Sequence, residues 1–279
     1  MKNKSLLYSV SVLVVSWGFT LLLFQNEEQA LKSFALVMFA PLVVAIIFNR
    51  IPALKLTSEV RFFNFKGLKL PSWLFGLFYP IVMVLVIAVM NLSFGISDLK
   101  DLSSSDVKKL VTVISTFIPA LLSAFGEEAG WRGYLLPSLA EKYSNIKATF
   151  ITGVVWATFH MPVVYLLAKV QHVPNPALVT LVQAGTAFTI SFSFAYIFFK
   201  TRSLIPVILL HASWNLFNPY VLGNIYTNET GILKGNLFIQ NGEGVMGLIV
   251  LLIACIFFRY RIKQLETTQG QAGNIGPSV

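Results

Sequence analysis

The sequence has few charged residues for its length. Charged residues make up 12% of the 279 positions, whereas about 25% is usual in a soluble globular domain. Hydrophobic residues account for 56% of the chain, and 24 of its residues are Phe. A soluble domain of this composition would lack the polar side chains needed to cover its surface. The composition therefore predicts an all-α polytopic membrane protein.

Cysteine and several familiar enzyme motifs are also scarce or absent. Cys255 is the only cysteine and lies in an apolar run, so the chain can form no internal disulfide. The sequence contains neither the HExxH motif of zinc proteases nor the GxSxG motif of serine hydrolases. The segment "GEGVMG" (242–247) has the spacing of a dinucleotide-binding loop, but it precedes an apolar run and no βαβ unit surrounds it. We therefore set this segment aside.

Long apolar runs occupy most of the chain. A membrane span needs roughly 20 such residues. The first run follows "MKNK" and could begin a signal peptide, but it is long for one and no small-residue cleavage site follows it. We predict about eight transmembrane helices in one membrane domain over residues 1–263, followed by a polar and disordered tail over 264–279. The runs lie at about 6–24, 31–49, 72–92, 110–126, 148–168, 177–199, 203–222 and 244–260.

The basic residues indicate how the helices are oriented. With the N-terminus in the cytoplasm, most of the 21 Lys and Arg residues fall in cytoplasmic loops, as the positive-inside rule requires. The net charge of +9 therefore reflects contact with membrane lipid and does not indicate a nucleic-acid partner. We expect an integral protein of a bacterial plasma membrane with both termini in the cytoplasm.

The segment "GEEAGWRGYLLP" (126–137) places two carboxylates at the end of an apolar run. Carboxylates are costly in hydrocarbon and so indicate a function by default. Glu128 and Arg132 are one helical turn apart and can form a pair. Glu127 points about 100° away from Glu128 and is free for another role. The alternative is a salt bridge that marks the end of a membrane helix.

Two further polar groups lie inside apolar runs. His160 is in the middle of the fifth run, and His211 and Asn215 share one face of the seventh. Each could instead hydrogen-bond to a neighbouring helix. Taken together, the residues suit amide hydrolysis: a Glu and a His can activate water, and a His and an Asn can stabilise an oxyanion. His172 lies in a short loop and is interpreted as a solvated residue.

Three of these segments resemble the motifs of one family. "EEAGWRGYL" resembles the EExxxR motif of the CPBP family, also called the Abi or CAAX-protease-like family. "WATFH" is similar to its FxxxH motif, with Trp156 in the place of Phe, and "HASWN" is similar to its HxxxN motif. The three occur in the family's order, and the resemblance covers about residues 110–220.

The resemblance implies a fold, an activity and roles for individual residues. The family's type II CAAX prenyl endopeptidases remove the last three residues of prenylated CAAX proteins within an eight-helix membrane fold. By resemblance, Glu127 is the base that activates water and His160 assists it. His211 and Asn215 would form the oxyanion pocket. Glu128 and Arg132 would be a structural pair beside the site, and Trp156 would keep an aromatic wall.

The cofactor and the substrate stay open at this point. Glu127, His160 and His211 could bind zinc, but an active site without a metal suits the pairing of His211 with Asn215 better. The substrate would be a peptide or protein, lipidated or not. Two other functions are compatible with the residues. One is a non-catalytic bacteriocin-immunity or chaperone-like protein. The other is an ion-coupled transporter, although the sequence shows no internal repeat.

Overall fold

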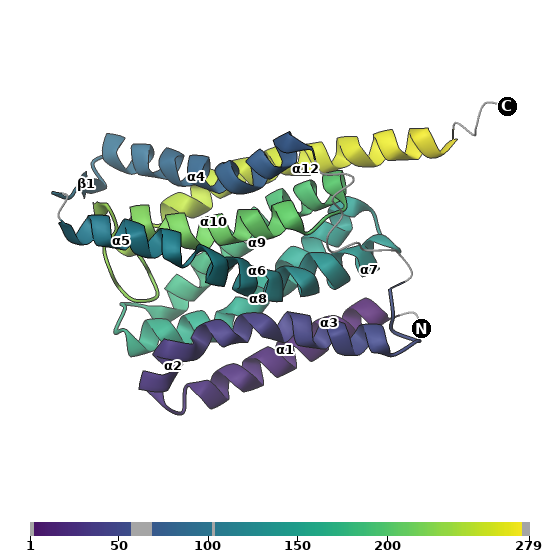
Figure 1. Cartoon of the computed structure of the whole chain (residues 1–279), viewed down its shortest axis with the longest axis horizontal. Coiled ribbons are helices and arrows are strands. Elements are labelled where there is room, and N and C mark those ends of the chain that lie inside the picture. Colours follow the sequence, from purple (N-terminus) through teal and green to yellow (C-terminus); the bar gives the residue numbers. More distant parts are fainter. Residues whose placement is uncertain (1–2, 57–68, 102–103, 275–279) are drawn as a thin grey trace.

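The computed structural model describes residues 3–56, 69–101 and 104–274, and most of them are helical. The long helices run side by side as one bundle, with the N- and C-terminal ends at the same end of it (Figure 1). The predicted fold class, an all-α polytopic membrane protein, is confirmed.

The helices coincide with the apolar runs. Single helices cover five of the eight runs: α1 (Lys4–Leu23), α4 (Leu70–Ser93), α8 (Asn145–Val170), α9 (Pro176–Thr201) and α10 (Ile205–Leu222). The second run is divided among α2 (Glu27–Ser33), η1 (Phe34–Phe39) and α3 (Ala40–Arg50), and the fourth between α5 (Ser104–Ser115) and α6 (Phe117–Gly130). The eighth lies in α12 (Val245–Asn274).

Shorter elements connect these helices. A π-helical turn, η2 (Trp131–Leu135), continues α6 and leads into α7 (Leu136–Ala140). The strands β1 (Ser97–Leu99) and β2 (Leu233–Gly235) pair antiparallel, and α11 (Leu237–Gln240) follows β2. α12 continues to Asn274, well into the segment for which the sequence predicts a disordered tail.

Six helical stretches among the described residues are long and apolar enough to cross a bilayer. The predicted number of eight spans is therefore not confirmed. The run at 110–126 is interrupted at Thr116, and α10 carries His211, Asn215 and Asn218, which lower its mean hydropathy. Large apolar side chains are exposed on the outer helices, including Val14, Leu22 and Ile253. An apolar outer surface is what a bilayer requires.

The packing of the bundle buries the second half of α6, whereas Ile118 and Leu122 in its first half are exposed. α8 packs against α9, α10 against α4, and α12 against α9. α6 lies between α3 and α10, and it is here that the glutamate pair of the sequence is found. Gly126 and Gly130 allow η1 and α3 to approach α6 closely, because a Cβ atom at Gly130 would lie 2.3 Å from Pro41 Cβ and 2.5 Å from the Tyr8 hydroxyl.

Substitution of Gly130 by Ala is expected to lower the free energy of unfolding by about 1–3 kcal/mol, because an added methyl group in a well-packed interior forces neighbours apart. Tyr8 donates a hydrogen bond to the Pro41 carbonyl at 2.8 Å, so neither neighbour can move freely. Gly18→Ala is the matched control, since nothing lies within 4 Å of its Cβ position. The midpoint of thermal unfolding in detergent would be measured for both variants. Equal midpoints for Gly130→Ala and Gly18→Ala would contradict the packing argument.

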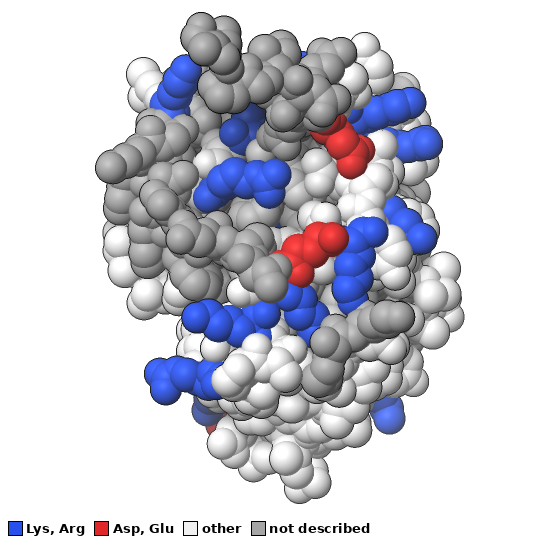
Figure 2. Space-filling model, turned by 90° about the vertical axis from the view of Figure 1, so that its right-hand side faces the viewer, with Lys and Arg blue, Asp and Glu red and all other residues white. Residues whose placement is uncertain are grey.

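Basic side chains gather at one end of the bundle. The start of α1, the ends of α3 and α9, the α7–α8 connection and the second half of α12 carry Lys or Arg and lie at the same end (Figure 1). Figure 2 shows this end, with many blue side chains and few red ones. Lys2, Arg61 and Lys66, which also support the orientation argument, lie outside the described residues. The cytoplasmic location of both termini stays a prediction.

Candidate active site

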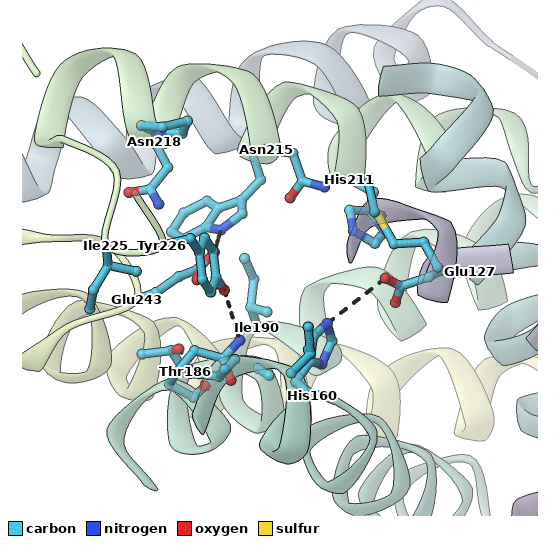
Figure 3. A pocket seen from close by; sticks show the side chains of 18 of the residues that line it. Glu127, His160, Thr186, Ile190, His211, Asn215, Asn218, Ile225, Tyr226 and Glu243 are labelled. Atoms are coloured by element: carbon cyan, nitrogen blue, oxygen red, sulfur yellow. Dashed lines mark hydrogen bonds and ion pairs between the residues drawn. The ribbon is translucent and has the colours of Figure 1, made fainter. Parts of the chain in front are cut away.

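The structure places the predicted site residues around one cavity. Glu127 comes from α6, His160 from the middle of α8, and His211 and Asn215 from α10. All four line a cavity of about 310 Å³, and their side chains can be followed in Figure 3. Residues from η1, α9 and the segment after α10 complete its wall. His172 lies in the turn after α8 and is not among the lining residues.

Two indole groups hold the carboxylate of Glu127, whose side chain is 1% exposed. Its Oε2 accepts hydrogen bonds from Trp131 Nε1 at 3.1 Å and from Trp156 Nε1 at 2.6 Å. The other oxygen, Oε1, lies 3.8 Å from His160 Nε2. One oxygen is therefore fixed by donors while the other faces the imidazole.

The orientation of His160 follows from its second ring nitrogen. Nδ1 lies 2.9 Å from the backbone carbonyl oxygen of Trp156. A carbonyl oxygen only accepts hydrogen bonds, so Nδ1 carries a proton, and in the neutral ring Nε2 presents a lone pair toward Glu127. The 3.8 Å separation is too long for a direct hydrogen bond, and a water beside the pair can bond to both groups.

Glu128 and Arg132 form a fully buried ion pair. Arg132 Nη1 lies 3.0 Å from each oxygen of Glu128, and both side chains are 0% exposed. Oε1 of Glu128 also lies 2.8 Å from His211 Nδ1. This third contact joins α6 to α10 and means that Glu128 orients a residue of the cavity. The sequence predicts the i,i+4 pair but carries no signal for the contact with His211.

Aromatic rings surround the Arg132 cation. Its Cζ lies 4.5 Å from the centre of the Trp156 ring and 4.6 Å from that of Phe194. Nη2 donates to Ser191 Oγ at 3.2 Å. Ion pairing, cation–π contacts and a hydroxyl acceptor replace part of the water that this guanidinium loses on burial, while its Nε has no hydrogen-bond partner among the described residues.

Trp156 does more than form an aromatic wall. Its indole N–H donates to Glu127, a contact that the Phe of the family motif could not make, and its ring packs on Arg132. The sequence did not predict this role, because the family motif has Phe at this position and Phe has no N–H group to donate.

Trp156→Phe is expected to lower kcat by about tenfold or more while the protein still folds, since a hydrogen bond to a charged group contributes about 1.5–3 kcal/mol. Trp17→Phe is the matched control, because the Trp17 N–H also donates, at 3.3 Å to the Thr158 carbonyl, but Trp17 does not line the cavity. Peptide cleavage by the purified variants is the measurement. A Trp156→Phe enzyme as active as Trp17→Phe would show that the indole contact is dispensable.

A second polar group lies across the cavity from Glu127 and His211 (Figure 3). Glu243 Oε1 accepts from Trp214 Nε1 at 3.3 Å, and Oε2 accepts from the Tyr226 hydroxyl. Burial and the neighbouring Glu243 carboxylate raise the pKa of Tyr226 well above its ordinary value, so the phenol keeps its proton. Sequence reasoning missed Glu243 because it lies in the "GEGVMG" segment, which was set aside.

Whether the site residues could hold a metal depends on which of their atoms are already bonded. Within the described part of the chain, no group of three or more His, Cys, Asp or Glu side chains is arranged to hold a metal ion. His211 Nδ1 is occupied by Glu128, and one oxygen of Glu127 is occupied by two indole groups. These contacts leave His211 Nε2, His160 Nε2 and Glu127 Oε1 available, so the zinc set of Glu127, His160 and His211 that the sequence allows stays an alternative.

Comparisons with known proteins agree with the motifs. Residues 109–217 match the model of a family described as "Type II CAAX prenyl endopeptidase Rce1-like". The chain is also 29% identical over 144 residues to CAAX prenyl protease 2 of Methanococcus maripaludis, an alignment that covers 48% of this chain and 51% of the relative. The chain thus spans about half the length of the curated relative that it matches. The resemblance inferred from the three motifs is confirmed by both comparisons.

Proposed function

We propose that this protein is an intramembrane endopeptidase that hydrolyses a peptide bond with water activated by Glu127 and His160. The observation that carries the proposal is the arrangement of Glu127 Oε1 and His160 Nε2, 3.8 Å apart, in the same cavity as His211 and Asn215. An acceptor pair for water beside a potential oxyanion pocket is what hydrolysis of an amide requires. The similarity of residues 109–217 to type II CAAX prenyl endopeptidases supports this reading.

In the proposed reaction, a water held by Glu127 and His160 attacks the carbonyl carbon of the substrate. Glu127 takes one proton of the water as the new carbon–oxygen bond forms, and the carbonyl oxygen becomes an oxyanion. The amide of Asn215 and the imidazole of His211 donate to this oxygen. The carbon–nitrogen bond then breaks, and the departing amine receives the proton that Glu127 took from the water. The products are a carboxylic acid and an amine, and the remaining proton of the water then passes from the acid to the amine to give a carboxylate and an ammonium group.

Glu128 allows His211 to carry the proton on Nε2 that this step needs. A neutral imidazole whose Nδ1 donates to Glu128 has no proton on Nε2. Paired with the Glu128 carboxylate, the ring can carry protons on both nitrogens, and Nε2–H then donates to the oxyanion. Arg132 shares the same carboxylate, so the three buried charges fix one another's positions. Glu128 and Arg132 are positioning residues in this scheme.

The substrate that fits this proposal is a peptide or protein segment that reaches the cavity from the membrane or its surface. The name of the matched family suggests prenylated substrates, and the lipid-facing outer surface of the bundle suits a lipidated chain. Several residues of the wall come from η1, the 3₁₀ stretch between α2 and α3. We place both termini in the cytoplasm on the basis of the clustered basic residues, which sets the face from which substrates are offered.

Cleavage of quenched peptides by the purified protein in detergent tests the proposal. A prenylated peptide and its unprenylated counterpart would be incubated with the wild-type protein, each with and without a tight zinc chelator. We expect cleavage that persists with the chelator. Loss of cleavage on chelation would show a zinc enzyme instead. No cleavage of either peptide would favour a non-catalytic immunity or chaperone-like role.

A further inference from the structure

We propose that Glu243 and Gln183 form a subsite for a basic side chain, Lys or Arg, of the peptide substrate. The proposal rests on the proposed endopeptidase function and specifies which peptides that site selects. Both residues line the cavity that also contains Glu127 and His160. Figure 3 shows Glu243 and Tyr226 across the cavity from Glu127 and His211.

The first argument is an acceptor with no partner. Gln183 is 3% exposed, and its Oε1 has no hydrogen-bond partner among the described residues. Its Nε2 donates to the Tyr226 hydroxyl at 3.4 Å, and that hydroxyl donates in turn to Glu243. Because the Tyr226 proton is directed to Glu243, a rotated amide would bring two acceptor oxygens together. The amide is thus fixed with Oε1 free, and a buried free acceptor needs a donor.

The second argument is the spare capacity of the Glu243 carboxylate. Its two oxygens receive the Trp214 and Tyr226 donors described above, whereas a carboxylate offers about four acceptor positions. No Lys or Arg lines the described part of the cavity, so no protein cation neutralises Glu243 there. An ammonium or guanidinium group supplies both the charge and the several donors that this end lacks.

The third argument is that the subsite is rigidly built. The Gly242 backbone N–H donates to Asn218 Oδ1 at 3.0 Å, and the Glu243 N–H donates to Asn241 Oδ1 at 2.8 Å. A Cβ atom on Gly242 would lie only 2.5 Å from Asn218 Oδ1, so the turn depends on glycine. The carboxylate is therefore held in place before any substrate arrives.

The length of the cavity sets where the basic residue falls in the peptide. His211 and Pro219 both line the cavity and are eight residues apart on α10, which corresponds to about 12 Å at 1.5 Å per residue. An extended peptide covers about 3.3 Å per residue. The basic residue should lie within about four positions of the bond that is cleaved, and an acidic residue there should be rejected.

The experiment compares acetylated, amidated peptides in which one Lys, or the uncharged norleucine, is moved along the sequence. Dissociation constants and kcat/KM are measured for wild type, Glu243→Gln and Glu229→Gln. Glu229 is the matched control, because it is exposed and does not line the cavity. We expect wild type and Glu229→Gln to prefer Lys at one position by about tenfold or more, and Glu243→Gln to lose that preference.

The outcomes separate this inference from the proposed function. A Lys preference in binding that depends on Glu243, without cleavage, would support the subsite and overturn the endopeptidase. Cleavage with equal use of Lys and norleucine by the wild type would overturn the subsite and keep the endopeptidase. The wild-type comparison holds even if Glu243→Gln fails to fold. A failure of both peptides to bind, or an equal preference in wild type and Glu243→Gln, would also overturn the subsite.

Discussion

Replacement of Glu127 by Gln is expected to lower kcat by about 10²–10⁴-fold, the contribution typical of a general base. The amide has nearly the same shape, and its oxygen can still accept from Trp131 and Trp156. It cannot take a proton from water, so the chemistry is lost while the packing of α6 is kept. Cleavage of the quenched peptide and the midpoint of thermal unfolding would be measured on the same preparation.

Glu28→Gln is the matched control for this change. Glu28 is an exposed carboxylate that pairs with Lys32 at 2.6 Å on α2, away from the cavity. It should keep full activity and full stability. Wild-type cleavage by Glu127→Gln would remove Glu127 from the role of base. A large fall in its unfolding midpoint would instead assign the loss of activity to the fold.

Replacement of Arg132 by Ala is expected to lower the free energy of unfolding by about 3–5 kcal/mol, because it leaves the carboxylate of Glu128 buried without its cation. Arg132 also fills the space between the rings of Trp156 and Phe194, so its removal opens a cavity. Activity should fall as well, since Glu128 holds His211 through Nδ1. The change in the free energy of unfolding would be measured in mixed micelles, with the loss of the helical circular-dichroism signal as the readout.

A paired substitution separates charge from packing. If the cost comes from the uncompensated Glu128 carboxylate, the double variant Glu128→Gln, Arg132→Met should be more stable than Arg132→Ala, because it removes both charges and keeps much of the side-chain volume. The same double variant should stay inactive, since His211 loses its carboxylate partner. Wild-type stability in Arg132→Ala would show that the ion pair contributes nothing to the fold.

The motif residues could be predicted because each is a polar side chain inside an apolar run, where burying it in hydrocarbon costs free energy. A carboxylate, an imidazole or an amide inside an apolar run is exceptional, so Glu127, His160 and His211 stand out without a structure. Glu243 does not stand out, because it lies between two glycines at the edge of a run. Trp131 and Trp156 are hidden for a different reason: an indole is apolar in composition and polar only at one N–H.

Two features of the fold went beyond what residue patterns could predict. The run at 110–126 is interrupted at Thr116, and six stretches among the described residues meet the length and hydropathy of a span, so the predicted number of eight is not confirmed. α12 also continues to Asn274, into the segment for which the polar composition predicts disorder.

The sequence by itself determined that this chain lies in a membrane, and it singled out the polar residues that we propose carry its chemistry. Burial of charge in hydrocarbon is so costly that composition reveals the membrane location and position makes the polar residues stand out. Only the tertiary structure decided how those residues lie: which oxygen of Glu127 faces His160, that Glu128 contacts His211 as well as Arg132, and that Glu243 lines the same cavity. These contacts join residues that lie on different helices, and no spacing along the chain encodes the packing that brings such helices together.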